Sequence, residues 1–532
     1  MTSIGEALVA QLVKRGVEIV FGIPGVHTIE LYRGLANSGI RHITPRHEQG
    51  AGFMADGYAR VSGKPGVAFV ITGPGLTNIL TAMAQARADS VPMLVVSGVN
   101  TLPTLGKGMG HLHELPNQQA LAATIAITSQ QVRTAEELTP AMDRVFAPFY
   151  RGRPGPAHIE IPLDVVGRDY AVATSNQEPR KRAAPSQLEV ERAARNLEAA
   201  RRPVILAGGG ARHSGEILRD LAEQLDAPVI QTVNARGLMY GHALGVPASP
   251  SLKAVRALIE NSDLVLAVGT ELGSTDYDMY ATGAIPQMAK MIRIDICNEQ
   301  LARHPADIIL HGDAKDTLES IFLKARLLQS GIRKGAERAA QTRAAAFEEV
   351  GPQYRELINI LNAIRDAVPN ALIVGDSTQP IYAGNLYYDH DRPGGWFNAA
   401  TGYGALGYGI PAAMGAALAD PKSRVICIVG DGGAQFSIPE IMVAVDENLP
   451  ITFVVWNNKG YGEIATSMQN VGVTVVGCDP TPPDFEKMAA AFGIPFFRCS
   501  AEPDEVSKNM KCSALLTGPS MIEIEASEFS PA

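Results

Sequence analysis

Three consecutive α/β domains with parallel sheets are the fold that this sequence predicts, and three observations predict it. Short apolar runs of strand length alternate with helical segments along most of the chain. This alternation is typical of strand–helix–strand units, in which the helix crosses over the sheet and the strands run parallel. Two stretches of different character, residues 171–185 and 324–353, divide the alternation into three parts, and 532 residues are ample for three domains.

Each domain is justified by its own strand-like runs. The first domain, predicted for residues 1–170, has them at 17–25, 66–75 and 92–99, with a helical segment at 77–90. The second domain, predicted for residues 186–327, has four, at 201–211, 227–235, 262–272 and 290–296. The third domain, predicted for residues 354–532, has four more, at 370–378, 424–433, 451–460 and 520–527. The polar residues 171–185 are interpreted as a linker, and the charged, alanine-rich residues 324–353 as a helical connection.

The composition is that of a globular protein and argues against two classes of partner. Hydrophobic residues make up 46% of the chain, the net charge is −9 and the pI is about 5.7. A mildly acidic protein has no global field that attracts nucleic acid or an anionic membrane. The five cysteines are scattered, and the apolar runs are far shorter than the ~20 residues that cross a bilayer. We therefore expect no nucleic-acid or membrane partner, and a cytoplasmic location.

The third domain contains the motif with the clearest chemistry. A Gly-Asp-Gly motif centred on Asp431 is separated by residues 433–456 from an Asn-Asn pair that ends at Asn458. Each polar side chain directly follows an apolar run, 424–430 for the aspartate and 451–456 for the asparagine. Parallel α/β sheets bind ligands beyond the carboxyl ends of their strands. Both side chains are therefore expected at one edge of the sheet.

These residue types suit a metal-bridged diphosphate. Mg²⁺ prefers oxygen ligands in octahedral array, often a carboxylate together with phosphate oxygens. Asp431 supplies the charge, Asn458 a neutral oxygen, and the Gly460 carbonyl a third oxygen. Gly432 and Gly433 let backbone N–H groups approach a phosphate closely near a helix N-terminus. For the Gly-Asp-Gly motif alone, an aspartate that merely caps a helix is the alternative.

This pair of motifs resembles the thiamine-diphosphate binding motif, and the resemblance extends over the whole chain. The sequence is similar to the acetolactate-synthase-like group of 2-oxo acid enzymes, most of all to its 5-guanidino-2-oxopentanoate decarboxylase branch. The resemblance implies a pyrimidine-binding N-terminal domain, a central domain and a diphosphate-binding C-terminal domain. It also implies thiamine diphosphate and Mg²⁺ as cofactors, a 2-oxo acid as substrate, and a homodimer or homotetramer that binds each cofactor between two subunits.

In the first domain, the resemblance assigns cofactor activation to Glu48, within residues 46–52. A carboxylate beside pyrimidine N1′ favours the imino form of the ring, whose nitrogen takes the C2 proton. Gly73 and Asn78 match the loop that faces the aminopyrimidine. The alternatives are a helix-terminal glutamate favoured by the macrodipole and an ordinary strand-to-helix turn.

Further cofactor contacts are implied in the third domain. Leu406 takes the position of the apolar residue that keeps the cofactor folded, and the Gly404 carbonyl would accept from the 4′-amino group. Ile464 is a further implied cofactor contact. A glycine-rich turn with Leu406 in the core is the alternative.

Two histidines are candidates for proton transfer near C2. His27 stands where benzaldehyde lyase has a histidine, and His113 stands where acetolactate synthases place a glutamine. A histidine pKa near 6.5 suits proton transfer at neutral pH. Surface or capping histidines are the alternative.

Residues 459–467 correspond to the wall of the substrate pocket. Glu463 is a carboxylate that suits a cationic substrate such as a guanidinium, or acid–base work. Ser467 stands where acetolactate synthases carry a tryptophan. Because both that tryptophan and the glutamine are missing, decarboxylation is favoured over acetolactate synthesis.

Three alternatives to a decarboxylase stay open. They are a carboligase that condenses pyruvate, a flavin-dependent oxidase and an inactive homologue. The glycine-rich turn within residues 203–211 and Asp295 at a strand end keep FAD open as a ligand of the central domain. A purely structural central domain is favoured.

Overall fold

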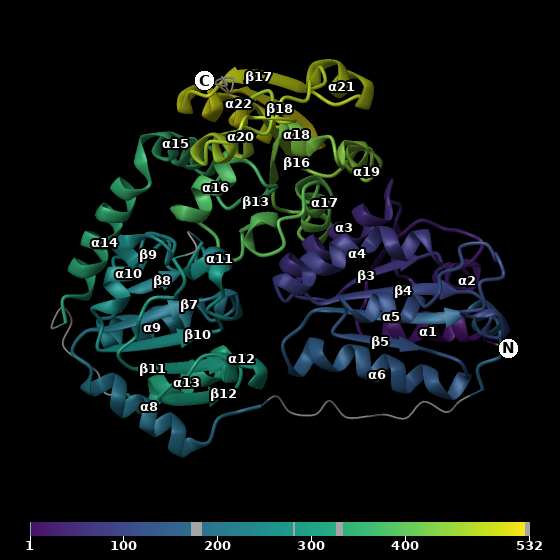
Figure 1. The fold of residues 1–532 in the computed structure, drawn as a ribbon, viewed down its shortest axis with the longest axis horizontal. Coiled ribbons are helices and arrows are strands. Elements are labelled where there is room, and N and C mark those ends of the chain that lie inside the picture. The colour runs from purple at the N-terminus through teal and green to yellow at the C-terminus, as the bar shows by residue number, and fades with distance from the viewer. Residues whose placement is uncertain (1, 172–182, 280–281, 326–332, 527–532) are drawn as a thin grey trace.

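The computed structural model describes residues 2–171, 183–279, 282–325 and 333–526, in three domains (Figure 1). Each domain has a six-stranded sheet in which all neighbouring strands are parallel. The predicted fold class, three α/β domains with parallel sheets, is confirmed. In Figure 1 the N-terminal domain lies at the lower right, the central domain at the lower left, and the C-terminal domain above both.

The N-terminal sheet has the strand order β2-β1-β3-β4-β6-β5. Its strands are β1 (Ile19–Gly22), β2 (Arg41–Ile43), β3 (Gly66–Val70), β4 (Met93–Val99), β5 (Thr128–Gln131) and β6 (Pro156–Pro162). Its helices are α1 (Ile4–Lys14), α2 (Ile29–Leu35), α3 (Glu48–Ser62), α4 (Pro74–Ala88), α5 (Gln118–Ala123), α6 (Ala135–Arg151) and α7 (Leu163–Val166). Local sequence sets several boundaries: Ser3 and Glu6 form a capping box at α1, and Gly63 ends α3 with φ +70°.

The central sheet has the strand order β12-β11-β10-β7-β8-β9. Its strands are β7 (Pro203–Ala207), β8 (Val229–Gln231), β9 (Gly245–Val246), β10 (Leu264–Val268), β11 (Met291–Asp295) and β12 (Ile308–His311). Its helices are α8 (Gln187–Ala199), α9 (Gly215–Leu225), α10 (Lys253–Glu260), α11 (Ser274–Tyr277), α12 (Asn298–Arg303) and α13 (Ala314–Lys324).

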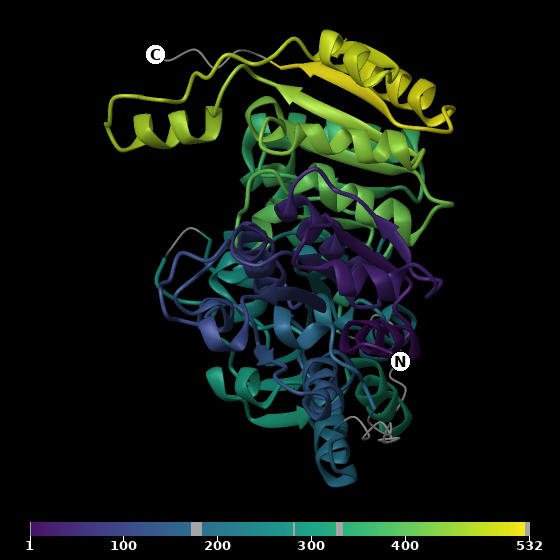
Figure 2. The same cartoon turned by 90° about the vertical axis from the view of Figure 1, so that its right-hand side faces the viewer.

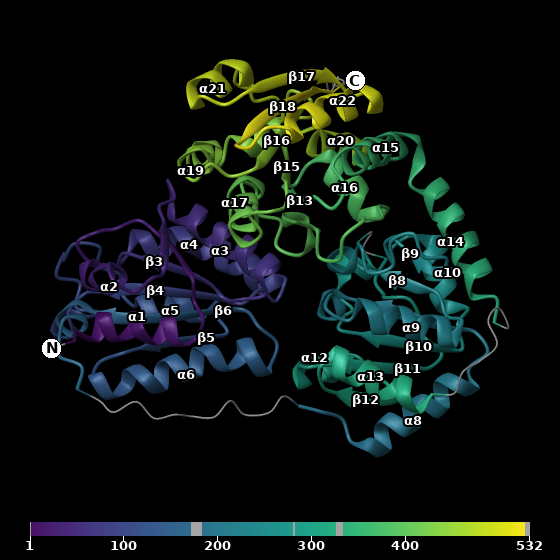
Figure 3. The same cartoon turned by 180° about the vertical axis from the view of Figure 1, so that it is seen from behind.

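Two helices, α14 (Gly335–Glu349) and α15 (Gly351–Ala367), connect the central and C-terminal domains along their shared outer side (Figure 3). The C-terminal sheet has the order β14-β13-β15-β16-β18-β17. Its strands are β13 (Leu372–Gly375), β14 (Trp396–Asn398), β15 (Val425–Gly430), β16 (Ile451–Asn457), β17 (Phe496–Ser500) and β18 (Ser520–Glu525). Its helices are α16 (Gln379–Leu386), α17 (Gly409–Ala419), α18 (Asp431–Ala434), α19 (Ile441–Asp446), α20 (Gly462–Asn470), α21 (Phe485–Phe492) and α22 (Pro503–Ala514).

The N-terminal and C-terminal domains share one apolar core. Met54 and Tyr58 of α3 are buried in the same cluster as Ala412 and Met414 of α17. The two helices approach closely because glycines face the crossing, where a side chain at Gly57 or Gly415 would overlap the other helix. The two domains therefore hold a fixed relation to each other within one chain.

Most of the predicted linker at residues 171–185 lies outside the described residues. The helical connection predicted for residues 324–353 is borne out by α14, and α15 begins at Gly351, just before the predicted start of the third domain at Tyr354. The domain limits 1–170, 186–327 and 354–532 stay predictions. Across the described parts of the chain, no helix has the length and apolar character needed to cross a membrane.

Candidate functional site

The C-terminal sheet reverses its strand order at one point, between β13 and β15. The chain passes from β13 to β14 on one side of it, and β15 then lies on the other side of β13. The crevice at such a reversal is a common ligand site. Asp376 follows β13 and Asp431 follows β15, so two buried carboxylates flank the crevice. Asp376 was not among the predicted site residues, although it also follows an apolar run that ends in glycine.

Asp431 has a carboxylate oxygen that the protein leaves unbonded. Its side chain is 1% exposed, and Oδ2 is buried without a hydrogen-bond partner. Burial raises the pKa of this carboxyl to about 6. The N-cap of α18 is Gly430, and no side-chain hydrogen bond caps this helix. Such an oxygen is available as a cation ligand, and the observation favours a ligand over a helix cap.

Asn458, after the neighbouring strand β16, lies beside this carboxylate. Its Oδ1 lies 3.1 Å from Asp431 Oδ1 and 2.8 Å from the carbonyl oxygen of Gly460. Its Nδ2 donates to Gln379 Oε1 at 3.2 Å. The register of β15 and β16, which pairs Gly430 with Trp456, explains why the two strand ends bring these side chains together.

A tryptophan fixes the orientation of the Asn458 amide. Trp456 Nε1 donates to Gln379 at 3.0 Å, and an indole nitrogen can only donate, so the Gln379 atom that faces it must be the oxygen. The same oxygen faces Asn458, whose nearer atom must therefore be its nitrogen. In this orientation the Asn458 oxygen points toward Asp431 and Gly460, whereas a reversed amide would donate to both of them and turn its own oxygen toward the Gln379 oxygen.

The Asn458 oxygen then faces two other oxygens, Asp431 Oδ1 at 3.1 Å and the Gly460 carbonyl oxygen at 2.8 Å. With Mg–O distances of about 2.1 Å at right angles, neighbouring ligands of Mg²⁺ lie about 3 Å apart. Oxygens this close repel one another, whereas a cation placed among them turns these contacts into favourable ones. Asp431, Asn458 and Gly460, the predicted metal ligands, therefore fit Mg²⁺.

Replacing Trp456 with phenylalanine is expected to weaken Mg²⁺ binding about tenfold, the low end of the effects typical of residues that orient metal ligands. Without the indole N–H, both amides are free to rotate, and Asn458 then donates to Asp431 instead of facing a cation. Calorimetric titration of Mg²⁺ with thiamine diphosphate present measures the change. Trp396→Phe is the matched control, because the buried Nε1 of Trp396 has no partner to lose. Equal affinities in the two variants would contradict the orienting role.

Gly433 leaves room next to bare backbone, whereas the space beside Gly432 is filled by a neighbouring side chain. A side chain at Gly432 would collide with the ring of Tyr461, and one at Gly433 would come within 3.5 Å of Leu406. Leu406 is half-buried, so it borders this space and is not wholly enclosed in the core. Gly404, with φ +76°, is exposed beside it in a conformation that favours glycine.

The N-terminal sheet has its own reversal, between β1 and β3, and the predicted residues of this domain surround it. Glu48 is the first residue of α3, and its Oε2 accepts from Asn78 Nδ2 at 2.9 Å. The other carboxylate oxygen stays available for a ligand. Gly73, with φ +65°, turns the chain from β3 into α4.

The two predicted histidines meet at the same edge. The rings of His27 and His113 lie edge to face, with centroids 5.1 Å apart. Burial and the neighbouring His113 lower the pKa of His27, which favours its neutral form, and its buried Nδ1 has no hydrogen-bond partner. His113 has φ +61° and lies against Gly73, where any side chain would clash with it.

Helix α20 carries the residues predicted for the pocket wall. Glu463 is half-buried, and Tyr354 donates to its Oε2 at 3.5 Å. Ser467 is exposed, and its hydroxyl donates to the Glu463 carbonyl oxygen. Ile464 is 55% exposed. Figure 2 shows this yellow-green segment reaching outward from the C-terminal domain.

The predicted residues therefore form two separate sets. The set on the N-terminal domain is His27, Glu48, Gly73, Asn78 and His113. The set on the C-terminal domain is Gly404, Leu406, Asp431, Gly432, Gly433, Asn458, Gly460, Glu463, Ile464 and Ser467. Within the described ranges of one chain, no hydrogen bond or ion pair joins a member of one set to a member of the other.

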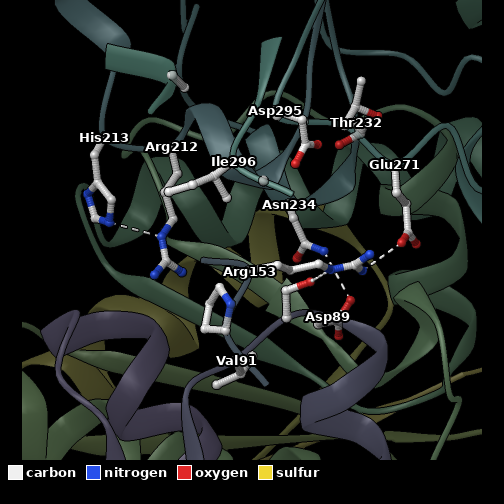
Figure 4. A pocket seen from close by; sticks show the side chains of 18 of the residues that line it. Asp89, Val91, Arg153, Arg212, His213, Thr232, Asn234, Glu271, Asp295 and Ile296 are labelled. Atoms are coloured by element: carbon white, nitrogen blue, oxygen red, sulfur yellow. Dashed lines mark hydrogen bonds and ion pairs between the residues drawn. The ribbon is translucent and has the colours of Figure 1, made fainter. Parts of the chain in front are cut away.

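A further cavity of about 340 Å³ lies where the three domains meet (Figure 4). Arg153 and Glu271, which both line this cavity, form an ion pair at 2.7 Å. Arg212, whose Nε donates to His213, borders the glycine-rich turn after β7, and burial lowers the pKa of Arg212 to about 10. Asp295, which the sequence keeps open as a possible FAD contact, also lines this cavity.

Comparisons with known proteins agree with this arrangement. Family models of thiamine pyrophosphate enzymes match residues 2–121 (N-terminal TPP binding domain), 190–321 (central domain) and 376–524 (C-terminal TPP binding domain). The chain is 42% identical to the probable 2-ketoarginine decarboxylase AruI of Pseudomonas aeruginosa, over 98% of this chain and 93% of the relative.

Acetolactate synthases are more distant relatives. The identity is 31% to the acetolactate synthase isozyme 1 large subunit of Escherichia coli, over 92% of this chain and 88% of the relative. It is also 31% to a probable acetolactate synthase large subunit of Methanocaldococcus jannaschii, over 98% and 91%. The three matched domains, in this order and over nearly the whole length, show that the chain belongs to the thiamine pyrophosphate enzyme family.

Proposed function

We propose that the protein is a thiamine-diphosphate- and Mg²⁺-dependent decarboxylase of 5-guanidino-2-oxopentanoate, the 2-oxo acid also called 2-ketoarginine. The observation that carries the substrate is the Glu463 carboxylate on α20, half-buried beside Tyr354. A carboxylate in this position complements a guanidinium through charge-assisted hydrogen bonds. The 42% identity to a probable 2-ketoarginine decarboxylase supports the same substrate.

The bound cofactor supplies a nucleophilic carbon and an electron sink for the loss of carbon dioxide. Glu48 holds a proton at the pyrimidine nitrogen N1′, with its Oε2 kept in place by Asn78. Asp431, Asn458 and Gly460 hold Mg²⁺, and the bare backbone at Gly432 and Gly433 receives the diphosphate. Each assignment rests on the chemistry of the group concerned: a carboxylate that can share a proton, oxygens that can bind a cation, and glycine backbone that a phosphate can approach.

His27, with its unbonded Nδ1, would take up a proton from water and pass it to the carbon that loses carbon dioxide. The ring of His113 packs against the His27 ring edge to face. Leu406 borders the same space from the C-terminal domain, and Ile464 and Ser467 line the approach along α20.

We expect Glu463→Gln to raise the KM for the guanidino substrate about 10- to 100-fold, because a hydrogen bond to a charged group contributes about 1.5–3 kcal/mol. An uncharged 2-oxo acid of similar length should be turned over at the wild-type rate. Carbon dioxide release from both substrates measures the effect. Glu486→Gln, which removes an exposed carboxylate from α21 outside the predicted site, is the control and should leave both KM values unchanged. Equal losses on the two substrates would contradict recognition of the guanidinium.

A panel of 2-oxo acids tests the function as a whole. Purified protein with thiamine diphosphate and Mg²⁺ is expected to release carbon dioxide and 4-guanidinobutanal from the guanidino substrate. The acetolactate synthase relatives favour one second candidate, condensation of pyruvate, and acetolactate as the main product would establish it. A flavin absorption band would instead support the oxidase alternative, and no turnover of any member would support an inactive homologue.

A homodimer or homotetramer is part of the proposal. The two sets of site residues lie on different domains, without hydrogen bonds or ion pairs between them in the described chain, which supports a site completed by a second subunit. Ile464 and the exposed Val471 and Val476, which are 75% and 71% exposed, give the outward segment around α20 an apolar surface for that subunit.

A further inference from the structure

A glutamate of the C-terminal domain reaches the point in the N-terminal domain where α3 begins. Glu440 ends the short 3-10 helix Ile438–Glu440 and is 2% exposed. Its Oε2 accepts from the backbone N–H of Arg46 and its Oε1 from the backbone N–H of His47, each at 2.9 Å. The next residue is Glu48. One carboxylate therefore holds the two peptide units that precede the candidate activating residue.

The first turn of α3 is shaped to admit this carboxylate. A Cβ atom at Gly50 would overlap Glu440 Oε1, so a residue with a side chain there would displace the carboxylate. The Arg46 guanidinium does not reach Glu440 and pairs instead with Asp446, while Arg41 pairs with Glu447. The neighbouring acidic side chains thus pair with the arginines, and Glu440 accepts its hydrogen bonds from backbone N–H groups.

Keeping a negative charge on the buried Glu440 side chain costs free energy. A residue that only capped α3 would not need that charge. Burial and, to a smaller extent, the nearby charge of Glu48 raise the pKa of Glu440 to about 7, against the two backbone N–H groups and Arg46. A neutral side chain would avoid the repulsion between the two carboxylates. Only a carboxylate offers two equivalent acceptors to two successive N–H groups.

We infer that Glu440 is a positioning residue for Glu48. It holds the first turn of α3 against the C-terminal domain, so that Glu48 stays at its hydrogen bond with Asn78 and at a fixed place in the site. The inference rests on the proposed role of Glu48. The contact between the N-terminal and C-terminal domains of one chain therefore positions a site residue, in addition to the apolar packing of α3 on α17.

Glu440→Gln tests this role. Glutamine fills the same space but offers one oxygen, so one of the two N–H groups faces an NH₂ group. The readout is the rate of hydrogen–deuterium exchange at C2 of bound thiamine diphosphate, measured by NMR after acid quench. We expect this rate to fall about 10- to 100-fold, since a displacement of about 1 Å in a site has effects of this order. The cofactor Kd and the melting temperature should change little.

Gly50→Ala provides a second variant that leaves Glu440 in the sequence and displaces its carboxylate from the opposite side. It should slow the exchange similarly, and it keeps the test intact if Glu440→Gln does not fold. Asp446→Asn is the matched control, because it removes an exposed partner of Arg46 and leaves both backbone hydrogen bonds.

Two results separate the inference from the proposed function. Wild-type exchange in both Glu440→Gln and Gly50→Ala, with slow exchange in Glu48→Gln, would overturn the positioning role alone. Wild-type exchange in Glu48→Gln would overturn the role of Glu48 and the inference with it. A fall in melting temperature without a change in exchange would mean that Glu440 is a structural residue only.

Discussion

Glu48→Gln is expected to lower kcat by about 10²- to 10⁴-fold, the range typical of positioned acid–base groups, while the cofactor stays bound. Glutamine keeps the shape and can still accept from Asn78, but it cannot exchange a proton with a pyrimidine nitrogen. Steady-state carbon dioxide release gives kcat, and calorimetric titration gives the cofactor Kd. A Kd within about threefold of wild type would confine the loss to the chemical step.

A control variant tests whether loss of a charge at a helix N-terminus alone could lower activity. Glu48 begins α3, where a negative charge interacts favourably with the helix dipole by about 0.3–1 kcal/mol. Glu6→Gln removes a comparable charge from the first turn of α1. It should lower the melting temperature by a similar amount and leave kcat unchanged. If Glu48→Gln also retained wild-type kcat, Glu48 would be a helix-terminal charge and nothing more.

Asp431→Ala is expected to abolish Mg²⁺-dependent cofactor binding, with a rise in Kd of at least about 100-fold. Removal of the only charged ligand assigned to the protein leaves Mg²⁺ two neutral protein oxygens, from Asn458 and Gly460. A hard divalent cation gains little from those alone once it must shed water. Calorimetric titration with thiamine diphosphate at several Mg²⁺ concentrations measures the loss, and excess Mg²⁺ should not reverse it.

Asp484→Ala is the matched control for the reading of Asp431 as a helix cap. Asp484 does cap its helix, since its side chain accepts from the Lys487 backbone N–H. Its replacement should cost about 1 kcal/mol of stability and leave cofactor binding intact. Metal-dependent binding that persisted in Asp431→Ala would show that the cation binds elsewhere.

The two variants together test the shared site. In a dimer that builds each site from both subunits, a mixed dimer of Glu48→Gln and Asp431→Ala chains has one doubly altered site and one intact site. Co-production with random pairing should therefore restore about a quarter of the wild-type activity, although each variant alone is nearly inactive. No recovery would mean that one chain supplies a whole site.

The interior strands of the central and C-terminal sheets were predictable from sequence, and their edge strands were not. The predicted runs in the second and third domains correspond to β7, β8, β10, β11, β13, β15, β16 and β18. The strands without a predicted run there are β9, β12, β14 and β17, and all four lie at sheet edges. Interior strands are buried on both faces and read as continuous apolar runs. An edge strand such as β17 is only partly buried, and β9 has only two residues, so neither leaves a clear pattern.

For the site, adjacency of strand ends made Asp431 and Asn458 predictable, because neighbouring parallel strands end at the same edge. Gln379 gave no such signal, although it decides which way Asn458 points. The influence of Gln379 depends on a hydrogen bond from the indole N–H of Trp456. The spacing of residues along the sequence does not reveal the direction of such a hydrogen bond.

The sequence by itself determined the three parallel α/β domains, the residues at their strand ends and the family motif, because these follow from local periodicity and short-range order. Only the tertiary structure decided which distant groups meet. Glu440 bonds the backbone of Arg46 and His47 across 394 and 393 residues, and His27 meets His113 ring to ring. Such contacts arise from the packing of whole domains, where every element constrains the rest, so no local pattern encodes them.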